Sequence, residues 1–211
     1  MGTSQSSQLY EIINCVTFFN FRRVLDVGIG HGQYGFMLRH RVAGTMDLEA
    51  MTIDGIEGFM PYVTDLQRLL YNNLFLDRAE IVLPSLPDQA YECALLIDVL
   101  EHLDAPTAHL LVGHLRRVAA VVLVSTPAEW IPQSDEVNPL ENHVSLWNRR
   151  TLTAMGATAF LPNDQSHLAL FAAPQYEERV RTYAHKRQRL AYVPVPLRRH
   201  LLKARSILRR Q

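Results

Sequence analysis

Residues 24–32 of this 211-residue chain read VLDVGIGHG, and this stretch decides the fold. The apolar run that starts at Val24 is typical of a buried strand. Three glycines at alternate positions follow it, and residues 33–39, QYGFMLR, then take up the spacing of a helix. A strand that passes through glycines into a helix leaves bare main chain beside a helix N-terminus, where a ligand can approach closely. We therefore expect residues 28–32 to shape a ligand pocket.

The spacing of these glycines separates two kinds of nucleotide-binding loop. Dinucleotide sites use G-x-G-x-x-G, in which the third glycine lets the helix pack closely on the strand. Here Gln33 stands at that position, and the glycine comes one residue earlier, at Gly32. The resulting pattern, D-x-G-x-G-x-G, disfavours a nicotinamide-dependent dehydrogenase, as does the lack of a substrate domain.

Strand and helix patterns alternate along the chain, which predicts a doubly wound, mostly parallel α/β sheet with helices on both faces. We expect strands over residues 22–27, 50–57, 74–77, 91–98, 119–127, 158–161 and 166–172, and helices over residues 6–18, 33–43, 61–73, 104–118, 148–156 and 176–188. In two of these helices we expect the following side chains to face inward: Tyr62, Leu66, Leu69, Leu70, Leu110, Leu111, Leu115 and Val118. Such sheets bind ligands at the carboxyl ends of their strands. Four polar residues fall at such ends: Glu57, Asp77, Asp98 and Ser125.

The charge is divided unevenly along the chain, although the formal net charge is zero. Residues 176–211 carry eleven Lys or Arg and two acidic residues, whereas the rest carries ten basic and nineteen acidic residues. No apolar stretch approaches the ~18 residues of a membrane span, and no signal-peptide pattern begins the chain. Two cysteines are too few for a disulfide framework. We expect a cytoplasmic protein.

The division of charge suggests an α/β domain over residues 1–173, which includes the helix over residues 6–18, and a basic helical extension over residues 174–211. Three roles for the extension stay open. We rank packing on the acidic surface of the same or a partner subunit first. Peripheral binding to an anionic membrane comes next. Binding to nucleic-acid phosphates comes last, because no interleaved aromatic residues support base recognition.

Four features between residues 22 and 173 occur together: the glycine loop, the acid that ends the second strand, the segment DVLEH at residues 98–102 and the strand end STP at residues 125–127. With them the sequence resembles the class I S-adenosylmethionine-dependent methyltransferases, which implies a Rossmann-like, seven-stranded sheet and S-adenosylmethionine as cofactor. The resemblance implies cofactor contacts from Asp26, Gly28, Gly30, Gly32, Glu57, Asp77 and Asp98. Glu57, preferred to Asp54, would hold the ribose hydroxyls. Asp77 would meet the adenine amino group, although it is offset by one residue from the acid of relatives.

A second group of residues carries the candidate chemistry. Asp98, Glu101 and His102 stand at i, i+3 and i+4, a spacing that brings three side chains to one face of a helical turn. Together with His143, this segment resembles the metal site of the small-RNA 2′-O-methyltransferases. The resemblance implies that Asp98, Glu101, His102 and His143 bind a divalent ion, Mg²⁺, Mn²⁺, Fe²⁺ or Zn²⁺. The same segment occurs in metal-free methyltransferases, where the histidine borders the cofactor pocket or caps the next helix. If no metal is bound here, His102 and His143 would be the general bases.

Two longer runs, GQYGFMLR at residues 32–39 and NPLENHVSLW at residues 138–147, resemble small bacterial methyltransferases of polysaccharide and natural-product gene clusters. This resemblance implies O-methylation of a sugar or small-metabolite hydroxyl by in-line transfer, with help from a histidine base or a divalent metal. Two alternatives stay open. One is a non-catalytic subunit that binds S-adenosylmethionine, and the other is an RNA 2′-O-methyltransferase.

Overall fold

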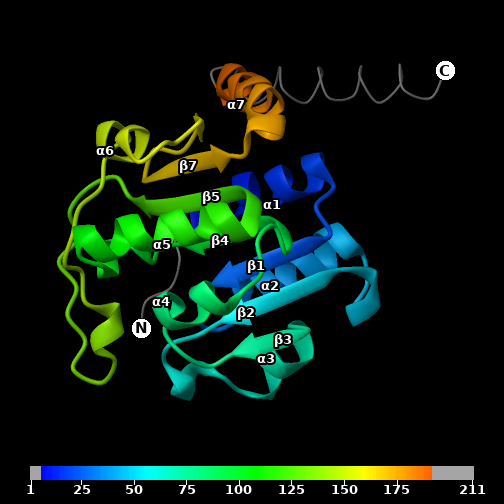
Figure 1. Ribbon diagram of the computed structural model, residues 1–211, viewed down its shortest axis with the longest axis vertical. Helices are drawn as coiled ribbons and strands as arrows, with labels where there is room; N and C mark the ends of the chain where they lie inside the picture. The colour runs from blue at the N-terminus through cyan, green and yellow to red at the C-terminus, as the bar shows by residue number, and fades with distance from the viewer. Residues whose placement is uncertain (1–5, 192–211) are drawn as a thin grey trace.

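The computed structural model describes residues 6–191, which form an open seven-stranded sheet with helices on both faces (Figure 1). The strands are β1 (Arg23–Val27), β2 (Thr52–Ile56), β3 (Asn73–Phe75), β4 (Tyr91–Ile97), β5 (Ala119–Pro127), β6 (Ala159–Leu161) and β7 (Ser166–Ala172). The helices are α1 (Ser6–Phe19), α2 (Gln33–Met37), α3 (Asp65–Leu70), α4 (Ala79–Val82), α5 (Ala105–Val118), α6 (Arg149–Ala154) and α7 (Glu177–Ala191). Short 3₁₀ or π turns lie at Leu38–Ala43, Leu48–Ala50, Met60–Tyr62, Leu83–Ser85, Leu100–His102, Pro139–Glu141 and Pro174–Tyr176.

The strand order of the sheet is β3-β2-β1-β4-β5-β7-β6. The first five strands in this order pair in parallel, and β7 runs antiparallel to both of its neighbours, β5 and β6. The doubly wound, mostly parallel fold predicted from the sequence is therefore confirmed. The chain winds outward in one direction from β1 to β3 and returns to β4 on the other side of β1. Ligands of such sheets bind at this switch point, beyond the carboxyl ends of β1 and β4.

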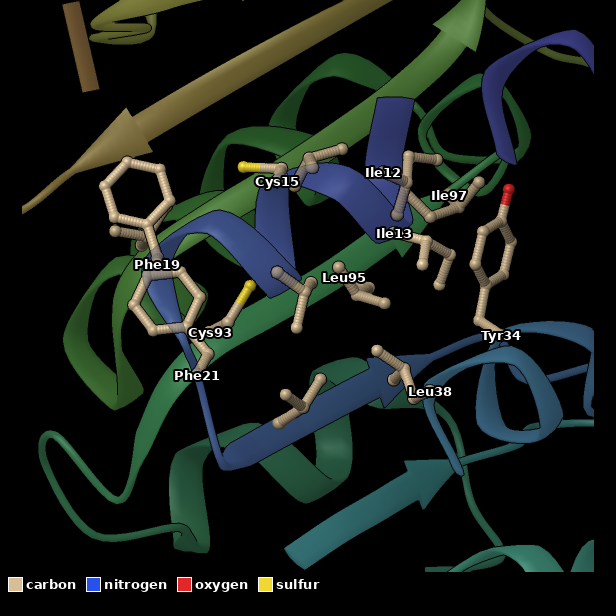
Figure 2. Close-up of a cluster of buried hydrophobic side chains, with 14 of the residues drawn as sticks. Ile12, Ile13, Cys15, Phe19, Phe21, Tyr34, Leu38, Cys93, Leu95 and Ile97 are labelled. Atoms are coloured by element: carbon tan, nitrogen blue, oxygen red, sulfur yellow. The ribbon is translucent and has the colours of Figure 1, made fainter. Parts of the chain in front are cut away.

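Two apolar layers hold the helices to the sheet. Alternate residues of a strand point to opposite faces, so that Cys93, Leu95 and Ile97 of β4 join one layer and Ala94 and Leu96 join the other. Figure 2 shows the first layer, in which side chains of α1 and α2 cover β1 and β4. Helices α5 and α6 cover the opposite face. A sheet covered on both faces explains why its central strands are almost continuously apolar.

Helix α7 belongs to the first apolar layer, through the buried side chains of Val180, Tyr183 and Ala184. It also covers the edge strand β6, since the side chains of Arg181 and Gln188 donate hydrogen bonds to backbone carbonyls at or beside that strand, at 3.0 and 2.9 Å. None of the described helices, α7 included, combines the length and apolar character needed to cross a membrane. We considered membrane or nucleic-acid binding for the basic extension over residues 174–211. Most of that extension, residues 192–211, lies outside the described residues.

The segment before β3 departs from the sequence-based expectation. We expected a helix over residues 61–73, but α3 begins only at Asp65, because Thr64 and Gln67 form a capping box at its N-terminus. The buried residues of α3 are Gln67 and Leu70, so the expectation that Leu66 and Leu69 point inward was wrong: both are exposed. In α5 the expectation for Leu110 was likewise wrong: Leu110 is exposed and Val112 is buried instead.

A buried arginine fixes the end of α3. Arg39 is fully buried. Its Nε donates to the backbone carbonyl of Leu70 at 3.0 Å, and its Nη2 donates to Oδ1 of Asn72 at 2.6 Å. A buried guanidinium is tolerated only where its donors find acceptors, and backbone and amide oxygens supply them here. These bonds hold Tyr71, which lies between the two partners, in one position under the glycine loop.

Candidate functional site

A pocket of about 450 Å³ opens at the carboxyl ends of β1, β2 and β4. Three segments that follow these strands supply its walls: the glycine loop after β1, residues 57–58 after β2 and residues 98–103 after β4. A fourth wall comes from residues 128–147, the long segment between β5 and α6, which we call the 128–147 loop. The pocket therefore occupies the switch point of the sheet, where ligands of doubly wound proteins bind.

The glycine loop has a backbone that only glycine adopts without strain. Gly28 has a φ of 74°, and a Cβ placed on it would lie 2.5 Å from Cγ2 of Val99. Its N–H donates to the carbonyl of Ile56 at 2.9 Å, so the loop turns back against β2. Gly28 and Gly30 line the pocket. Gly32, which stands at the N-terminus of α2, is outside the lining and packs against Leu70 of α3.

Glu57 braces the glycine loop from the neighbouring strand. Its Oε2 accepts a hydrogen bond from the N–H of Gly30 at 2.9 Å, and its Oε1 accepts one from the N–H of Phe59 at 2.8 Å. Burial raises the pKa of this carboxyl. The other acid of the strand, Asp54, is not in the pocket lining and accepts from the hydroxyl of Tyr91 at 2.8 Å. The structure therefore places Glu57 in the pocket, and Asp54 in a buried polar contact elsewhere.

Asp26 lies beneath the pocket rather than in its wall. Its Oδ2 accepts a hydrogen bond from the hydroxyl of Tyr71 at 2.6 Å. The Tyr71 ring fits under the loop because Gly35 has no side chain: a Cβ there would lie 2.6 Å from the hydroxyl oxygen. Asp26 thus supports the loop from below. The sequence analysis did not single out Tyr71, because the two residues are 45 positions apart.

The buried carboxyl of Asp26 gives a testable dependence of stability on pH. Burial, against the opposing hydrogen bond from Tyr71, raises its pKa from 3.8 to about 7. A raised acid pKa adds stability below the unfolded value, and that stability is lost as the pH rises through the folded value. Asp26→Asn keeps the acceptor for Tyr71 and carries no charge. We expect the free energy of unfolding of the variant, relative to the unaltered protein, to rise between pH 4 and pH 7 by up to about 4 kcal/mol. Urea unfolding at several pH values measures this difference, and parallel curves would contradict it.

Asp98 takes part in a network that includes the N-terminal helix. Its Oδ2 accepts from Nε2 of Gln8 at 2.6 Å, and its Oδ1 accepts from the hydroxyl of Ser125 at 2.9 Å. The residue has a φ of 53°, in the left-handed region that favours glycine, so the chain turns sharply here at the end of β4. Asp98 lines the pocket, but its carboxylate faces Gln8 and Ser125. Gln8 was not expected from the sequence, since it lies 90 residues before its partner.

In the segment after β3, we expected Asp77 to contact the cofactor, but other residues of this segment line the pocket. Asp77 is exposed, lies outside the pocket lining, and accepts a hydrogen bond from the backbone N–H of Arg78 at 2.7 Å. Arg78, Ala79 and Glu80 line the pocket, and the side chains of Arg78 and Glu80 form an ion pair.

Three of the four residues considered as metal ligands come together. Glu101, His102 and His143 each offer a ligand atom, and these atoms lie within 4.8 Å of one another. The two imidazole rings have their centroids 4.9 Å apart. Asp98 is not part of this group, because the left-handed turn at Asp98 precedes the 3₁₀ turn that carries Glu101 and His102, and the helical spacing assumed from the sequence is not continuous.

Both histidines are oriented by backbone carbonyls. Nδ1 of His102 lies 3.2 Å from the carbonyl oxygen of Asn142, and Nδ1 of His143 lies 2.6 Å from that of Ile131. A carbonyl accepts only, so each Nδ1 carries the hydrogen and each Nε2 keeps its lone pair. Burial lowers the pKa of His102, which favours the neutral ring. This is the arrangement typical of histidines that bind a metal or accept a proton.

Glu101 is buried beside these rings. Burial and the nearby Asp98 raise the pKa of its carboxyl to about 8. Within the part of the chain that the structure describes, its Oε2 has no hydrogen bond of normal geometry. Ionising this buried carboxyl without compensation is costly, as its raised pKa reflects, and a cation would supply that compensation. One carboxylate and two imidazole nitrogens form a donor set that first-row divalent metals accept. The residues present therefore fit a metal ion.

Hydrogen bonds between the end of the 128–147 loop and the turn after β4 position His143 beside His102. The backbone N–H groups of Val144 and Ser145 donate to the carbonyl of Glu101 at 2.9 and 3.1 Å. The indole N–H of Trp147, which is buried, donates to the carbonyl of Leu100 at 3.1 Å. These contacts hold the end of the 128–147 loop against the turn after β4, so the histidine pair is assembled from two separate segments.

Comparisons with known proteins give likeness in structure alone. Neither a protein-family model nor a curated protein matches the sequence. The N-terminal domain of EvdMO1, crystallised in the presence of SAH and D-fucose, has a TM-score of 0.60 at 15% identity, and the match covers 82% of this chain and 85% of that one. The methyltransferase domain of bacterial CtHen1-CN has a TM-score of 0.53 at 16% identity, over 81% of this chain and 100% of that one.

A third similar structure, from Nostoc punctiforme, is assigned as an O-methyltransferase by inference. It has a TM-score of 0.57 at 19% identity, and the match covers 78% of this chain and 55% of that one. At these identities the likeness concerns the fold. The strand order, the parallel sheet and the reversed β7 of this chain fit that likeness. The chain has the fold of the class I methyltransferases.

Proposed function

We propose that the protein is an S-adenosylmethionine-dependent methyltransferase. The observation that carries this proposal is the pocket at the switch point, where the bare main chain of Gly28 and Gly30 faces the carboxylate of Glu57. Bare main chain that a ligand can approach closely and a carboxylate at the end of the second strand suit an adenosine compound, whose ribose hydroxyls would donate to the acid. The fold supports the same conclusion, since one similar structure contains SAH.

We further propose that the acceptor is a hydroxyl group of a sugar or small metabolite. When bound, S-adenosylmethionine would supply the methyl group: its methyl carbon bonds to the acceptor oxygen as the bond to the sulfonium sulfur breaks, and the sulfur keeps the electron pair as a neutral thioether. The hydroxyl must also lose its proton. Nε2 of His143 or of His102 is free to accept that proton, because the Nδ1 atoms are held at backbone carbonyls. Aligning the acceptor oxygen with the methyl group would supply much of the rate.

A divalent ion fits the same group of residues. Glu101, His102 and His143 would hold it, and it would bind the acceptor hydroxyl and lower its pKa. The buried Oε2 of Glu101 is the observation that favours this version. Either version assigns the histidines to the acceptor end of the pocket and Glu57 to the cofactor end.

Calorimetry tests the cofactor assignment. We expect SAH to bind the unaltered protein and NADH not to bind it. Glu57→Ala removes the acceptor for two backbone N–H groups and for the ribose, so SAH affinity should fall at least tenfold, which corresponds to loss of a charged hydrogen bond of about 1.5–3 kcal/mol. Glu49→Ala, which removes an exposed carboxylate far from the pocket, is the matched control and should bind SAH as before.

Binding of NADH with no response to SAH would refute the proposal. A non-catalytic subunit would differ in another way: it would bind SAH yet convert no S-adenosylmethionine with any hydroxylated acceptor. The histidine pair beside the pocket favours the catalytic version, because a subunit that only binds cofactor needs no proton acceptor there.

A further inference from the structure

The 128–147 loop places an aromatic side chain beside the histidine pair. The Trp130 ring lies edge-on to the His143 ring, with the centroids 6.2 Å apart and the planes at 64°. Trp130 is 49% exposed, and the next residue, Ile131, is 42% exposed and lines the pocket. Trp130 itself is outside the pocket lining, so its large apolar ring lies half open to solvent just beyond the edge of the pocket, next to a candidate catalytic group.

Hydrogen bonds hold this part of the loop in register with His143. The carbonyl of Ile131 accepts from Nδ1 of His143, and the carbonyl of Gln133 accepts from its backbone N–H at 3.0 Å. Nε2 of Gln133 also donates to the carbonyl of Glu141 at 2.8 Å. Trp130 is therefore attached to a segment that is tied to the histidine on both sides, and its position relative to that histidine is defined.

The charges around the pocket are mostly negative. Five carboxylates line it: Glu57, Glu80, Asp98, Glu101 and Glu141. Within residues 6–191 the lining contains one arginine, Arg78, and no lysine. Arg78 is paired with Glu80, and its Cγ lies 3.6 Å from the position of a Cβ on Gly58, at the end of the pocket that holds Glu57.

These two observations limit the acceptor. An anionic acceptor beside the histidines would meet the carboxyl groups of Glu101 and Glu141, and the only arginine of the lining within residues 6–191, Arg78, is already paired with Glu80, which is unfavourable in a partly desolvated pocket. An uncharged ring has no such penalty. Its C–H face can pack on the indole of Trp130 and the side chain of Ile131 while a hydroxyl turns toward His143, in the manner of sites with apolar walls and few polar groups.

We propose that Trp130, which lies just outside the pocket lining beside His143, borders the acceptor subsite and that this subsite selects an uncharged, hydroxylated ring over an anionic one. The inference rests on the proposed methyltransferase function and adds the class of acceptor to it. Trp130 acts here as a specificity-determining residue: it contacts the acceptor ring, and the proton transfer stays with the histidines.

Two sugars that differ in one group test the charge selection. D-Fucose and D-galacturonate share the ring configuration, and a carboxylate in the second replaces the methyl group of the first. Saturation-transfer NMR on the full chain loaded with SAH measures the dissociation constant of each sugar. We expect D-fucose to bind at least tenfold more tightly than D-galacturonate.

Variants of the loop test the role of the indole. Trp130→Leu should raise the dissociation constant of D-fucose at least fivefold, and Trp130→Phe, which keeps an aromatic face, should restore most of the affinity. Val137→Ala changes an apolar residue of the same loop that is 80% exposed and has no ring to pack beside His143, and should leave D-fucose binding unchanged. Because Trp130 is half exposed, both tryptophan variants should bind SAH as the unaltered protein does.

The outcomes separate the two proposals. If D-fucose binds no better than D-galacturonate, or if it binds Trp130→Leu as tightly as the unaltered protein, the acceptor inference is overturned while SAH binding can still stand. Failure of the unaltered protein to bind SAH refutes the proposed function itself. Should Trp130→Leu lose SAH binding, Trp130→Phe and the comparison of the two sugars still decide the question.

Discussion

Replacing His143 with alanine should lower the rate of methyl transfer by about a hundredfold to ten-thousandfold, the range expected for loss of a proton acceptor. The affinity for SAH should stay the same, because His143 comes from the 128–147 loop and is outside the glycine loop and the Glu57 contacts. The conversion of S-adenosylmethionine to SAH with a panel of neutral sugars measures the rate, and calorimetry measures the affinity.

His143→Ala also distinguishes a metal-binding role of this histidine from a role as general base. If an ion is bound by Glu101, His102 and His143, the unaltered protein should bind Mn²⁺ in electron paramagnetic resonance titrations and His143→Ala should bind it much more weakly. Chelation should then remove activity, and one of Mg²⁺, Mn²⁺, Fe²⁺ or Zn²⁺ should restore it. If the histidine is the base, chelation has no effect. His185→Ala, at an exposed position on α7, is the control. Unchanged turnover in His143→Ala would remove this residue from the mechanism.

Gly28→Ala should destabilise the protein by about 2–5 kcal/mol. Two physical effects add: a side chain at a φ of 74° costs about 1–2 kcal/mol, and the new Cβ, 2.5 Å from Cγ2 of Val99, overpacks the loop by about 1–3 kcal/mol more. The loop also forms the pocket wall, so SAH affinity should fall together with the free energy of unfolding. Urea denaturation and calorimetry follow the two quantities.

A matched variant separates strain from crowding. Gly44 has a φ of 71°, but nothing lies within 4 Å of a Cβ placed on it, so Gly44→Ala should show only the smaller strain cost. The double variant Gly28→Ala/Val99→Ala removes the side chain that the new Cβ would meet. After subtraction of the cost of Val99→Ala alone, it should recover part of the free energy of unfolding that is lost in Gly28→Ala. Equal losses in Gly28→Ala and Gly44→Ala would mean that the contact with Val99 is unimportant.

The strands, the glycine loop and the placing of Glu57 could be predicted because each depends on residues that are close together in the sequence. An apolar run, a glycine spacing and an acid at a strand end are all local patterns. The capping box of Thr64 and Gln67 is local too, and it predicts the observed start of α3.

Other parts of the site depend on contacts that no local pattern contains. Tyr71 lies under the loop only because Arg39 fixes its neighbours and Gly35 leaves room. Gln8 reaches Asp98 from a helix at the far end of the sequence. The spacing of Asp98, Glu101 and His102 suggested one helical face, and the left-handed turn at Asp98 interrupts it. Such features follow from the packing of distant segments.

The cover that α7 places over β6 also bears on how copies of this protein meet one another. An uncovered edge strand is a template on which a second chain can add its own strand, and natural proteins block such edges. Here Arg181 and Gln188 already occupy carbonyl oxygens at the β6 side of the sheet. A chain shortened before Glu177 would lose this block, and its sheet could extend into a neighbouring molecule. We therefore expect helix α7 to hinder pairing of this sheet edge with a second molecule.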